Sequence, residues 1–323
     1  MRTVVILLGI DEAGYGPLLG PLTVAGVAFR VPDDRADACL WRILADSITR
    51  SVRRTDIRLP IVDSKKLYSR QDGLMALERT ALVMLKTAGR QPASFKSLLK
   101  VVAPKMVGDL DAYPWYARFD PALPLATSAA DIGTRANAVR RDMDQQGVEL
   151  IAVHADVVCE GHFNRLVEAT RNKSILPLQS GMRIIQRMLE RGEGVALSVC
   201  VDRNGGRERY ADKLMTFFEG SSLRIREETP QRSAYELKTE LGAFSIEFVV
   251  KAEERSLPVA LASVFAKYVR EAMMRGLNAY FLEYLPTLAP TAGYYTDAQR
   301  FLEAIAPVIV RERLDRAMLV RSR

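Results

Sequence analysis

Residues 9–17 constrain this chain more than any other stretch. They read Gly-Ile-Asp-Glu-Ala-Gly-Tyr-Gly-Pro and overlap an apolar run at residues 4–10. An apolar run bounded by turn residues predicts a buried strand. Two adjacent carboxylates, Asp11 and Glu12, stand where this strand should end, and glycines that permit a sharp bend follow them. Because adjacent strand residues point to opposite faces, the two acids can share a metal ion only if the strand end is distorted.

The glycine-rich turn does not have the spacing of a nucleotide-binding loop. Its glycines fall at Gly14, Gly16 and Gly20, and no Lys-Ser or Lys-Thr pair follows them. Two carboxylates would also repel a phosphate unless a cation lay between them. The stretch therefore favours a cation site, although an acidic capped turn is the simpler interpretation of the pair alone.

Further acids follow two other apolar runs. Asp202 follows residues 195–201, and Glu253 and Glu254 come after residues 244–250. Carboxylates at the ends of sheet strands supply the oxygen ligands that Mg²⁺ and Mn²⁺ prefer. Two such ions about 3.5–4 Å apart can promote phosphoryl transfer. Each acid alone could be a helix cap, but the set predicts a metal site.

The composition is that of a globular protein. The chain has 323 residues, 48% of them hydrophobic, and a formal net charge of +7, which permits nucleic-acid binding. No apolar run approaches the roughly 18 residues of a membrane span, so we expect no membrane contact. The three cysteines are scattered and fit no disulfide framework, which indicates a cytoplasmic protein. The two histidines are too few for a histidine-based mechanism.

Strands alternate with helices along the chain, which predicts an α/β fold. We expect strands at residues 4–10, 20–29, 148–158, 195–201, 223–227 and 244–250. We expect helices at residues 33–54, 71–90, 95–102, 127–146, 163–170, 179–191, 207–218, 258–274 and 296–305. The aromatic segment 113–119 could stack nucleic-acid bases or fill a small core, and the second is favoured.

Five motifs resemble, in order, those of the type 2 ribonucleases H, the ribonuclease HII and HIII group. The first is residues 9–18 with Gly20-Pro21, and the second is Asp63-Ser64-Lys65-Lys66-Leu67. The third is Val199-Cys200-Val201-Asp202. The fourth is Lys251-Ala252-Glu253 with residues 260–267, and the last is Gly293-Tyr294-Tyr295-Thr296-Asp297.

This resemblance implies a ribonuclease H-like mixed sheet flanked by helices, with a helical C-terminal part. The catalytic domain would span residues 1–255 with an insertion at 91–147, and residues 256–323 would pack on it. The implied activity is metal-dependent cleavage of the RNA strand of RNA/DNA hybrids, or at ribonucleotides embedded in duplex DNA. We expect a monomer that uses two Mg²⁺ or Mn²⁺ ions.

The resemblance also implies roles for single residues. The metal-binding and catalytic acids would be Asp11, Glu12, Asp202 and Glu253. Gly14, Tyr15 and Gly16 would lie against the ribose 2′-hydroxyl, and Tyr294 would pack on the sugar at the ribose–deoxyribose junction. Lys65, Ser263 and Lys267 would contact backbone phosphates.

The sequence departs from the family pattern at two positions. Tyr15 stands where the family usually has a basic residue. Glu253 stands where Asp is common, and Glu254 competes with it for the fourth acid. Two alternatives therefore remain: a hybrid-binding protein without catalysis, and a nuclease of the same fold with another nucleic-acid substrate. Residues 154–162 contain zinc-ligand types, but their spacing favours a structural role.

Overall fold

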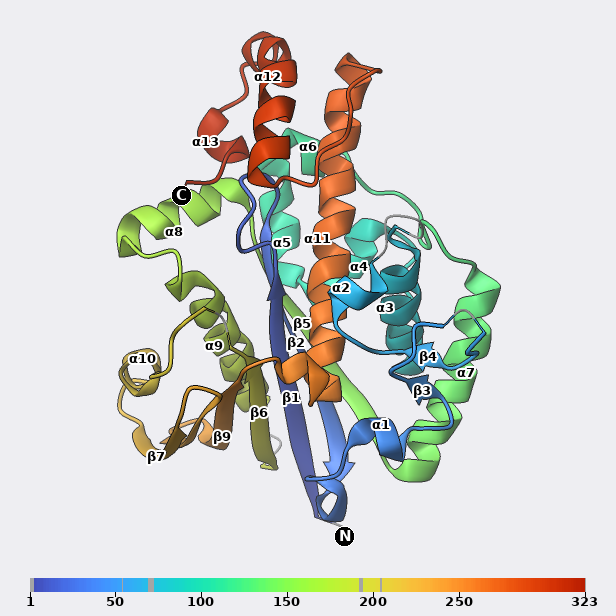
Figure 1. The fold of residues 1–323 in the computed structure, drawn as a ribbon, viewed down its shortest axis with the longest axis vertical. Coiled ribbons are helices and arrows are strands. Elements are labelled where there is room, and N and C mark those ends of the chain that lie inside the picture. Colours follow the sequence, from blue (N-terminus) through green and yellow to red (C-terminus); the bar gives the residue numbers. More distant parts are fainter. Residues whose placement is uncertain (1–2, 54, 69–72, 192–193, 204, 323) are drawn as a thin grey trace.

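A computed structural model describes residues 3–53, 55–68, 73–191, 194–203 and 205–322 (Figure 1). A seven-stranded sheet with the order β5-β2-β1-β6-β9-β8-β7 forms its centre. The strands are β1 (Val4–Ala13), β2 (Leu22–Pro32), β5 (Glu149–Val158), β6 (Ala196–Asp202), β7 (Ser222–Glu228), β8 (Arg232–Thr239) and β9 (Gly242–Val249). Strand β1 is antiparallel to β2 and parallel to β6, and β6 is parallel to β9. The predicted mixed sheet is confirmed.

Helices cover both faces of the sheet, and a helical part completes the chain (Figure 1). The α-helices are α1 (Leu40–Ile43), α2 (Ser64–Leu67), α3 (Met75–Thr87), α4 (Phe95–Val102), α5 (Pro104–Asp109), α6 (Pro114–Ala117), α7 (Ala129–Gln146), α8 (Glu160–Thr170), α9 (Ile175–Glu190), α10 (Ala211–Phe217), α11 (Leu257–Tyr284), α12 (Tyr295–Arg311) and α13 (Arg316–Leu319). The 3₁₀ turns are η1 (Asp33–Arg35), η2 (Leu110–Ala112) and η3 (Ala252–Glu254).

Alternation along β1 divides the interior into two cores. Val5 and Ala13 belong to the larger core, which α3, α4, α7 and α11 complete. Ile6, Leu8 and Ile10 belong to the core under α9 and α10. A Cβ at Gly9 would come within 2.2 Å of the backbone of α11, so glycine is needed where the helix crosses the strand. This close approach fixes α11 beside the end of β1.

The predicted helix at residues 33–54 is wrong. The chain forms η1, the short α1 and then β3 (Ile48–Thr49), which pairs with β4 (Leu59–Pro60); Arg54 lies outside the described residues. Trp41 donates a hydrogen bond from Nε1 to the Ile61 carbonyl, 2.8 Å away. The spacing of apolar residues in this stretch predicted one continuous helix. In the structure, the short helix α1 and the β3–β4 strand pair bury the apolar side chains instead.

Other helix predictions differ mainly at their ends. Helix α3 begins at Met75, and residues 71 and 72 of the predicted helix lie outside the described residues. Helix α11 runs ten residues beyond the predicted end at 274. Strand β8 was missed, although its inward side chains Tyr235 and Leu237 alternate with polar residues as a half-buried strand requires.

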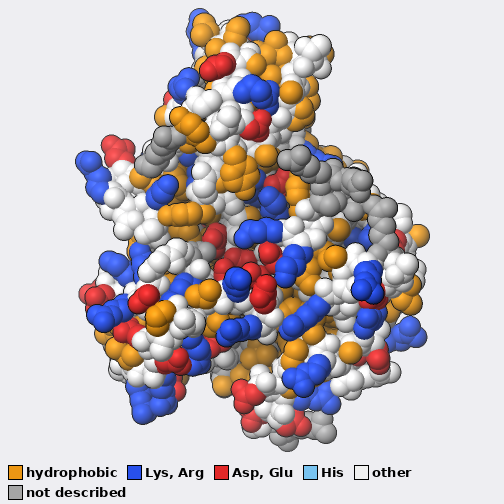
Figure 2. Space-filling model, viewed as in Figure 1, with side chains coloured by type: hydrophobic (Ala, Val, Ile, Leu, Met, Phe, Trp, Pro, Cys, Tyr) orange, Lys and Arg blue, Asp and Glu red, His pale blue; other side chains and the backbone are white. Residues whose placement is uncertain are grey.

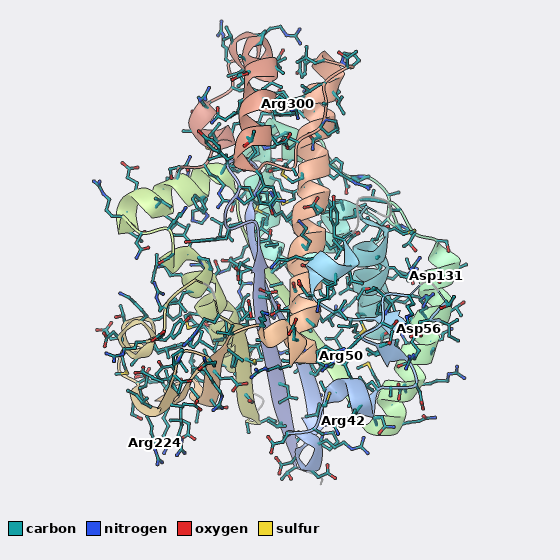
Figure 3. The ribbon with its side chains drawn as sticks, viewed as in Figure 1. Arg42, Arg50, Asp56, Asp131, Arg224 and Arg300 are labelled. Atoms are coloured by element: carbon teal, nitrogen blue, oxygen red, sulfur yellow. The ribbon has the colours of Figure 1, made fainter. Side chains whose placement is uncertain are left out.

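Residues 91–147 form α4–α7 and join the larger core. Tyr113, Trp115 and Tyr116 are each at most 3% exposed, so the base-stacking interpretation is wrong. The favoured prediction of a core role is right, but these side chains belong to the larger core and not to a small separate one. Asp131 on α7, labelled in Figure 3, binds Arg79 of α3 at 2.7 Å and Arg135 at 2.8 Å. The segment is therefore tied to α3 by charge as well as by apolar packing.

Helix α11 continues the same core, with Leu261 and Phe265 fully buried. The domain boundary at 255/256 and the insertion at 91–147 stay predictions. Among the described residues, no helix has the length and apolar character needed to cross a membrane.

Candidate active site

Two parallel strands bring the first pair of acids together. Strands β1 and β6 pair in a register that aligns Ile10 with Val201, so the next residues, Asp11 and Asp202, stand level at the sheet edge. Both lie on the face covered by α11, because Ile10 and Val201 belong to the opposite core. Two carboxylates thus stand where the pairing of β1 with β6 stops, although β1 itself continues beside β2 to Ala13.

Asp202 also contacts the turn η3. Its Oδ1 accepts a hydrogen bond of 2.9 Å from the backbone N–H of Ala252, which places Glu253 beside it. Burial, together with the negative charges of Asp11 and Glu253, raises the pKa of Asp202 to about 8. The predicted strand end at Glu253 needs correction: β9 stops at Val249, and Glu253 lies in η3.

Asp11 is only 8% exposed. Burial and the neighbouring Glu12 raise its pKa, whereas hydrogen bonds from Ser263 and from the Glu12 N–H lower it. The hydroxyls of Ser263 and Ser64 are hydrogen-bonded at 2.9 Å, so the second motif is connected to Asp11 through α11. The polar contacts partly offset the cost of burying this carboxylate.

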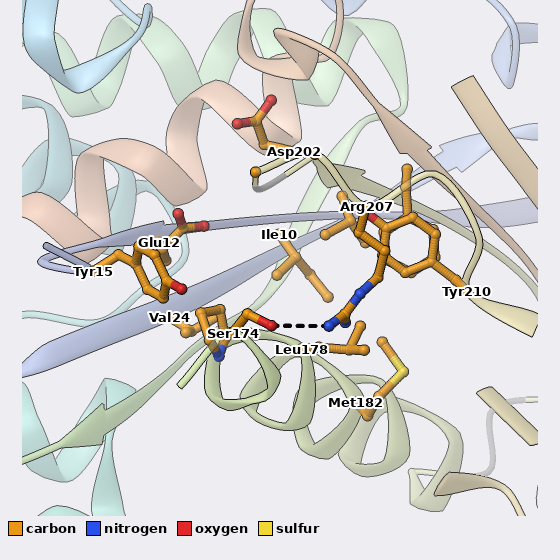
Figure 4. A pocket seen from close by; sticks show the side chains of 16 residues that line it. Ile10, Glu12, Tyr15, Val24, Ser174, Leu178, Met182, Asp202, Arg207 and Tyr210 are labelled. Carbon is orange, nitrogen blue, oxygen red and sulfur yellow. Dashed lines mark hydrogen bonds between the residues drawn. The ribbon is translucent and has the colours of Figure 1, made fainter. Parts of the chain in front are cut away.

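Glu12 points to the other face of β1. Pairing with β2 stays regular through Glu12 and Ala13, so the strand shows no distortion that would bring Glu12 round to Asp11. Glu12 instead lines a cavity of about 170 Å³ with Tyr15, Asp202 and Arg207 (Figure 4). Its negative charge acts on both Asp11 and Tyr15.

Glu253 and Glu254 have different surroundings. Oε2 of Glu253 is buried and has no hydrogen-bond partner among the residues that the structure describes. The carboxylate of Glu254 is about half exposed and forms an ion pair with Lys66 at 3.3 Å. Glu253 therefore faces the other acids and Glu254 faces the surface.

The residue types fit a hard divalent cation. Asp11, Asp202 and Glu253 supply only oxygen donors. Burial, and after it repulsion between neighbouring carboxylates, raises the pKa values of Asp11 and Asp202, and a bound cation would counter both effects. The partnerless Glu253 oxygen is a further available ligand atom. Within the described ranges, however, no three Asp, Glu, His or Cys side chains converge as a finished metal site.

Basic side chains surround the acids. Figure 2 shows Asp and Glu side chains near the middle of this face with Lys and Arg around them. At the cavity, Arg207 donates a 3.0 Å hydrogen bond to Ser174, and the two lie together in Figure 4. Lys173 Nζ is 5.6 Å from the centre of the Tyr15 ring. Lys173 and Arg207 were missed, although the Gly205-Gly206 turn after Asp202 points to a loop near the site.

The glycine loop and the late Gly-Tyr motif are joined by hydrogen bonds. Gly14 and Gly293 have φ values of +84° and +85°, and a Cβ at Gly293 would collide with the Leu19 carbonyl. The Gly293 carbonyl accepts hydrogen bonds from Leu18 (2.8 Å) and Leu19 (3.2 Å). Gly16 has open space around its Cα. Close backbone approach by another molecule is therefore possible at Gly16.

The other residues predicted to contact the substrate differ in how exposed they are. Tyr294 is 52% exposed and has Arg270 5.9 Å from its ring centre. Lys65 is exposed on α2. Lys267 is largely buried, 2.8 Å from Glu271 and close to the Tyr68 ring. Lys267 thus has a carboxylate partner inside the protein, whereas Lys65 faces solvent.

Several side chains of residues 154–162 have partners inside the protein. Glu160 accepts hydrogen bonds from Tyr116 and from the Gly20 N–H, and Asp156 pairs with Arg183. Cys159 is buried, with its pKa raised by burial.

The chain matches no protein-family model and no curated protein. Its structure is similar to that of RNase HII from Archaeoglobus fulgidus, solved in a complex with PCNA, at 16% identity and a TM-score of 0.42, over 98% of this chain and 94% of that one. It is similar to Bst-RNase HIII in complex with Mn²⁺, at 16% identity and a TM-score of 0.47, over 99% and 67%. It is also similar to ribonuclease H2 from Pyrococcus horikoshii OT3, at 14% identity and a TM-score of 0.42, over 97% and 92%.

Proposed function

We propose that this protein is a metal-dependent endoribonuclease that cleaves the RNA strand of RNA/DNA hybrids or cuts at ribonucleotides within duplex DNA. The observation that carries the proposal is the level placement of Asp11 and Asp202 at the ends of two parallel strands, with Glu253 beside them. Burying several carboxylates together is costly unless a cation balances them. Such a cost is expected at a functional site.

Asp11, Asp202 and Glu253 would hold Mg²⁺ or Mn²⁺ from the α11 face, with Glu12 on the cavity side. Two such ions, when bound, supply Lewis acidity and an activated water for phosphodiester hydrolysis. The hydrogen bond from the Ser263 hydroxyl lowers the pKa of Asp11 and so favours the ionised carboxylate, against the opposing effect of burial. The backbone N–H of Ala252 orients Asp202.

Substrate binding would use the loop and the basic residues around the acids. The backbone at Gly14 and Gly16 and the exposed Tyr294 would meet the ribose, whose 2′-hydroxyl distinguishes RNA from DNA. Lys65, and Arg207 at the cavity, would contact phosphates, which position a duplex without reading its sequence. Lys267 would have to leave Glu271 to do the same.

Three labelled duplexes test the proposal: DNA with one ribonucleotide, an RNA/DNA hybrid, and all-DNA. Each is incubated with the protein in Mg²⁺ and then in Mn²⁺, with Asp11→Asn and Asp202→Asn as variants. Cleavage confined to ribose-containing duplexes and lost in both variants is the expected result. Binding without cleavage would indicate a non-catalytic duplex-binding protein, and cleavage of all-DNA a nuclease with another substrate.

Metal binding is measured separately from cleavage. Mn²⁺ should raise the melting temperature of the wild-type protein, since a ligand that binds only the folded state stabilises it. Asp202→Asn should reduce that shift. Chelation should abolish cleavage and restore the metal-free melting temperature. An equal shift in Asp202→Asn would contradict the assignment of this carboxylate as a ligand.

A further inference from the structure

One arginine outside the predicted site contacts most of the loop that connects β1 and β2. The Arg321 guanidinium donates hydrogen bonds to the carbonyls of Gly14 and Tyr15, the latter at 2.8 Å, and its backbone N–H donates to the Leu18 carbonyl at 2.9 Å. A further contact reaches the Gly20 carbonyl at 3.5 Å. A single residue from the segment after α13 therefore holds a loop that is some 300 residues away in sequence.

Burial makes these contacts specific. Arg321 is 3% exposed, and its guanidinium lies over the Phe163 ring at 3.8 Å. An arginine out of water must direct its N–H groups at acceptors, because an unsatisfied buried charge is costly. The loop carbonyls accept from the two terminal nitrogens, whereas Nε has no hydrogen-bond acceptor among the described residues, and the Glu160 carboxyl group lies nearby. The arginine and the loop thus determine each other's position.

The segment that carries Arg321 is itself fixed to α8. The Asn164 side-chain amide donates to the carbonyls of Ala317 and Val320, both at 2.8 Å. Its oxygen accepts a hydrogen bond from the Ser322 N–H at 2.6 Å. Asn164 therefore positions both sides of Arg321.

The same loop presents groups to the cavity. Tyr15 lines it together with Glu12 and Asp202. Its position depends on the backbone at residues 14–16, where Arg321 binds two successive carbonyls. Displacing Arg321 would release this backbone without touching any of the acids.

We propose that Arg321 is a positioning residue that holds the 14–20 loop in the conformation that accepts the substrate, and that Asn164 fixes Arg321 for this task. The part of this inference that is tested by cleavage kinetics rests on the proposed nuclease function. The holding of the loop is independent of that function and can be measured without substrate.

The first measurement is hydrogen–deuterium exchange of a peptide covering residues 13–22, in substrate-free protein. Arg321→Ala should raise exchange in this peptide by about tenfold or more, because the loop loses its hydrogen bonds to the guanidinium. Arg321→Lys should give an intermediate value, since an ammonium lacks the planar fork. Arg316→Ala, which changes an exposed arginine of the adjacent helix α13, is the matched control and should leave exchange unchanged.

The second measurement is the kinetics of ribonucleotide-duplex cleavage. Arg321→Ala should raise KM about tenfold and change kcat less than threefold, as loss of substrate positioning predicts. Arg321→Lys should recover part of the KM. A loss of kcat with unchanged KM would overturn the positioning role.

A third variant covers the case in which Arg321→Ala does not fold. Asn164→Ala leaves the arginine in place but frees its segment, and it should raise exchange and KM in the same direction. Unchanged loop exchange in a folded Arg321→Ala or Asn164→Ala protein overturns the inference. If the wild-type protein cleaves nothing, the proposed function fails, while the exchange result still decides whether Arg321 holds the loop.

Discussion

The carboxylate of Glu254 forms an ion pair with Lys66, with 3.3 Å between Oε1 and Nζ, while Glu253 faces Asp202 from the same 3₁₀ turn. Two neighbouring acids of one residue type therefore provide a matched pair for mutation.

Glu253→Gln is expected to reduce cleavage by at least a hundredfold, because it removes a negative oxygen from the metal site. Glu254→Gln should reduce it less than about fivefold, since an exposed ion pair contributes at most about 1 kcal/mol. Single-turnover cleavage of the ribonucleotide duplex measures both. Equal losses in the two variants would remove Glu253 from the site.

Ser263→Ala should weaken metal binding. The hydrogen bond from Ser263 lowers the pKa of Asp11, so its loss raises that pKa and makes a bound proton harder to displace. The Mn²⁺ concentration for half-maximal cleavage should rise several-fold, and more at pH 6.5 than at pH 8.5. Ser64→Ala keeps the Ser263–Asp11 contact and is the control. A metal requirement that does not depend on pH in Ser263→Ala would contradict this account.

Glu160 should make stability depend on pH. Burial raises the pKa of this fully enclosed carboxyl to about 7. The folded protein therefore keeps a proton that the unfolded chain releases, and its stability falls as pH rises from about 4.5 to 7, by about 3 kcal/mol.

Glu160→Gln retains an oxygen for Tyr116 and Gly20 and should lack this loss. Urea unfolding at pH 5, 6, 7 and 8 measures the effect as the difference between variant and wild type. Glu168→Gln, an exposed acid of the same helix, should leave the pH profile unchanged. A constant difference between Glu160→Gln and wild type across the range would show that Glu160 is already ionised in the folded protein.

Glu78 should contribute strongly to the stability of the helical region. Its buried carboxylate accepts hydrogen bonds from the N–H groups of Leu125, Ala126 and Thr127 and from the Tyr268 hydroxyl. Glu78→Ala leaves these donors without an acceptor and should cost about 3–5 kcal/mol of unfolding free energy. Glu78→Gln, which keeps one acceptor, should cost less. A loss below 1 kcal/mol in the alanine variant would mean that water replaces the carboxylate.

The sequence was most informative where local pattern and chemistry coincide. Apolar runs ending in acids predicted that Asp11 and Asp202 lie at strand ends. This holds for Asp202, whereas β1 continues past Asp11 to Ala13, and the parallel pairing of the two strands up to Ile10 and Val201 brings the acids level. Spacing alone could not separate Glu253 from Glu254, because the choice depends on how η3 turns after β9. The role of Arg321 was out of reach for a similar reason. An arginine in a basic segment resembles any solvated charge until the fold buries it under the 14–20 loop.

The regular β1–β6 pairing ties the geometry of the candidate site to the assembly of the core. A strand advances about 3.3 Å per residue and alternates its faces, so deleting one residue from the 4–10 run would turn Asp11 away from Asp202 rather than shift it slightly. The separation of Asp11 and Asp202 can therefore change only in steps of one residue. Each such step would also move the side chains of β1 from one core to the other. Fine adjustment of the site is left to η3 and the 14–20 loop, whose backbones are outside the sheet, and these are the segments in which to look for functional differences among related proteins.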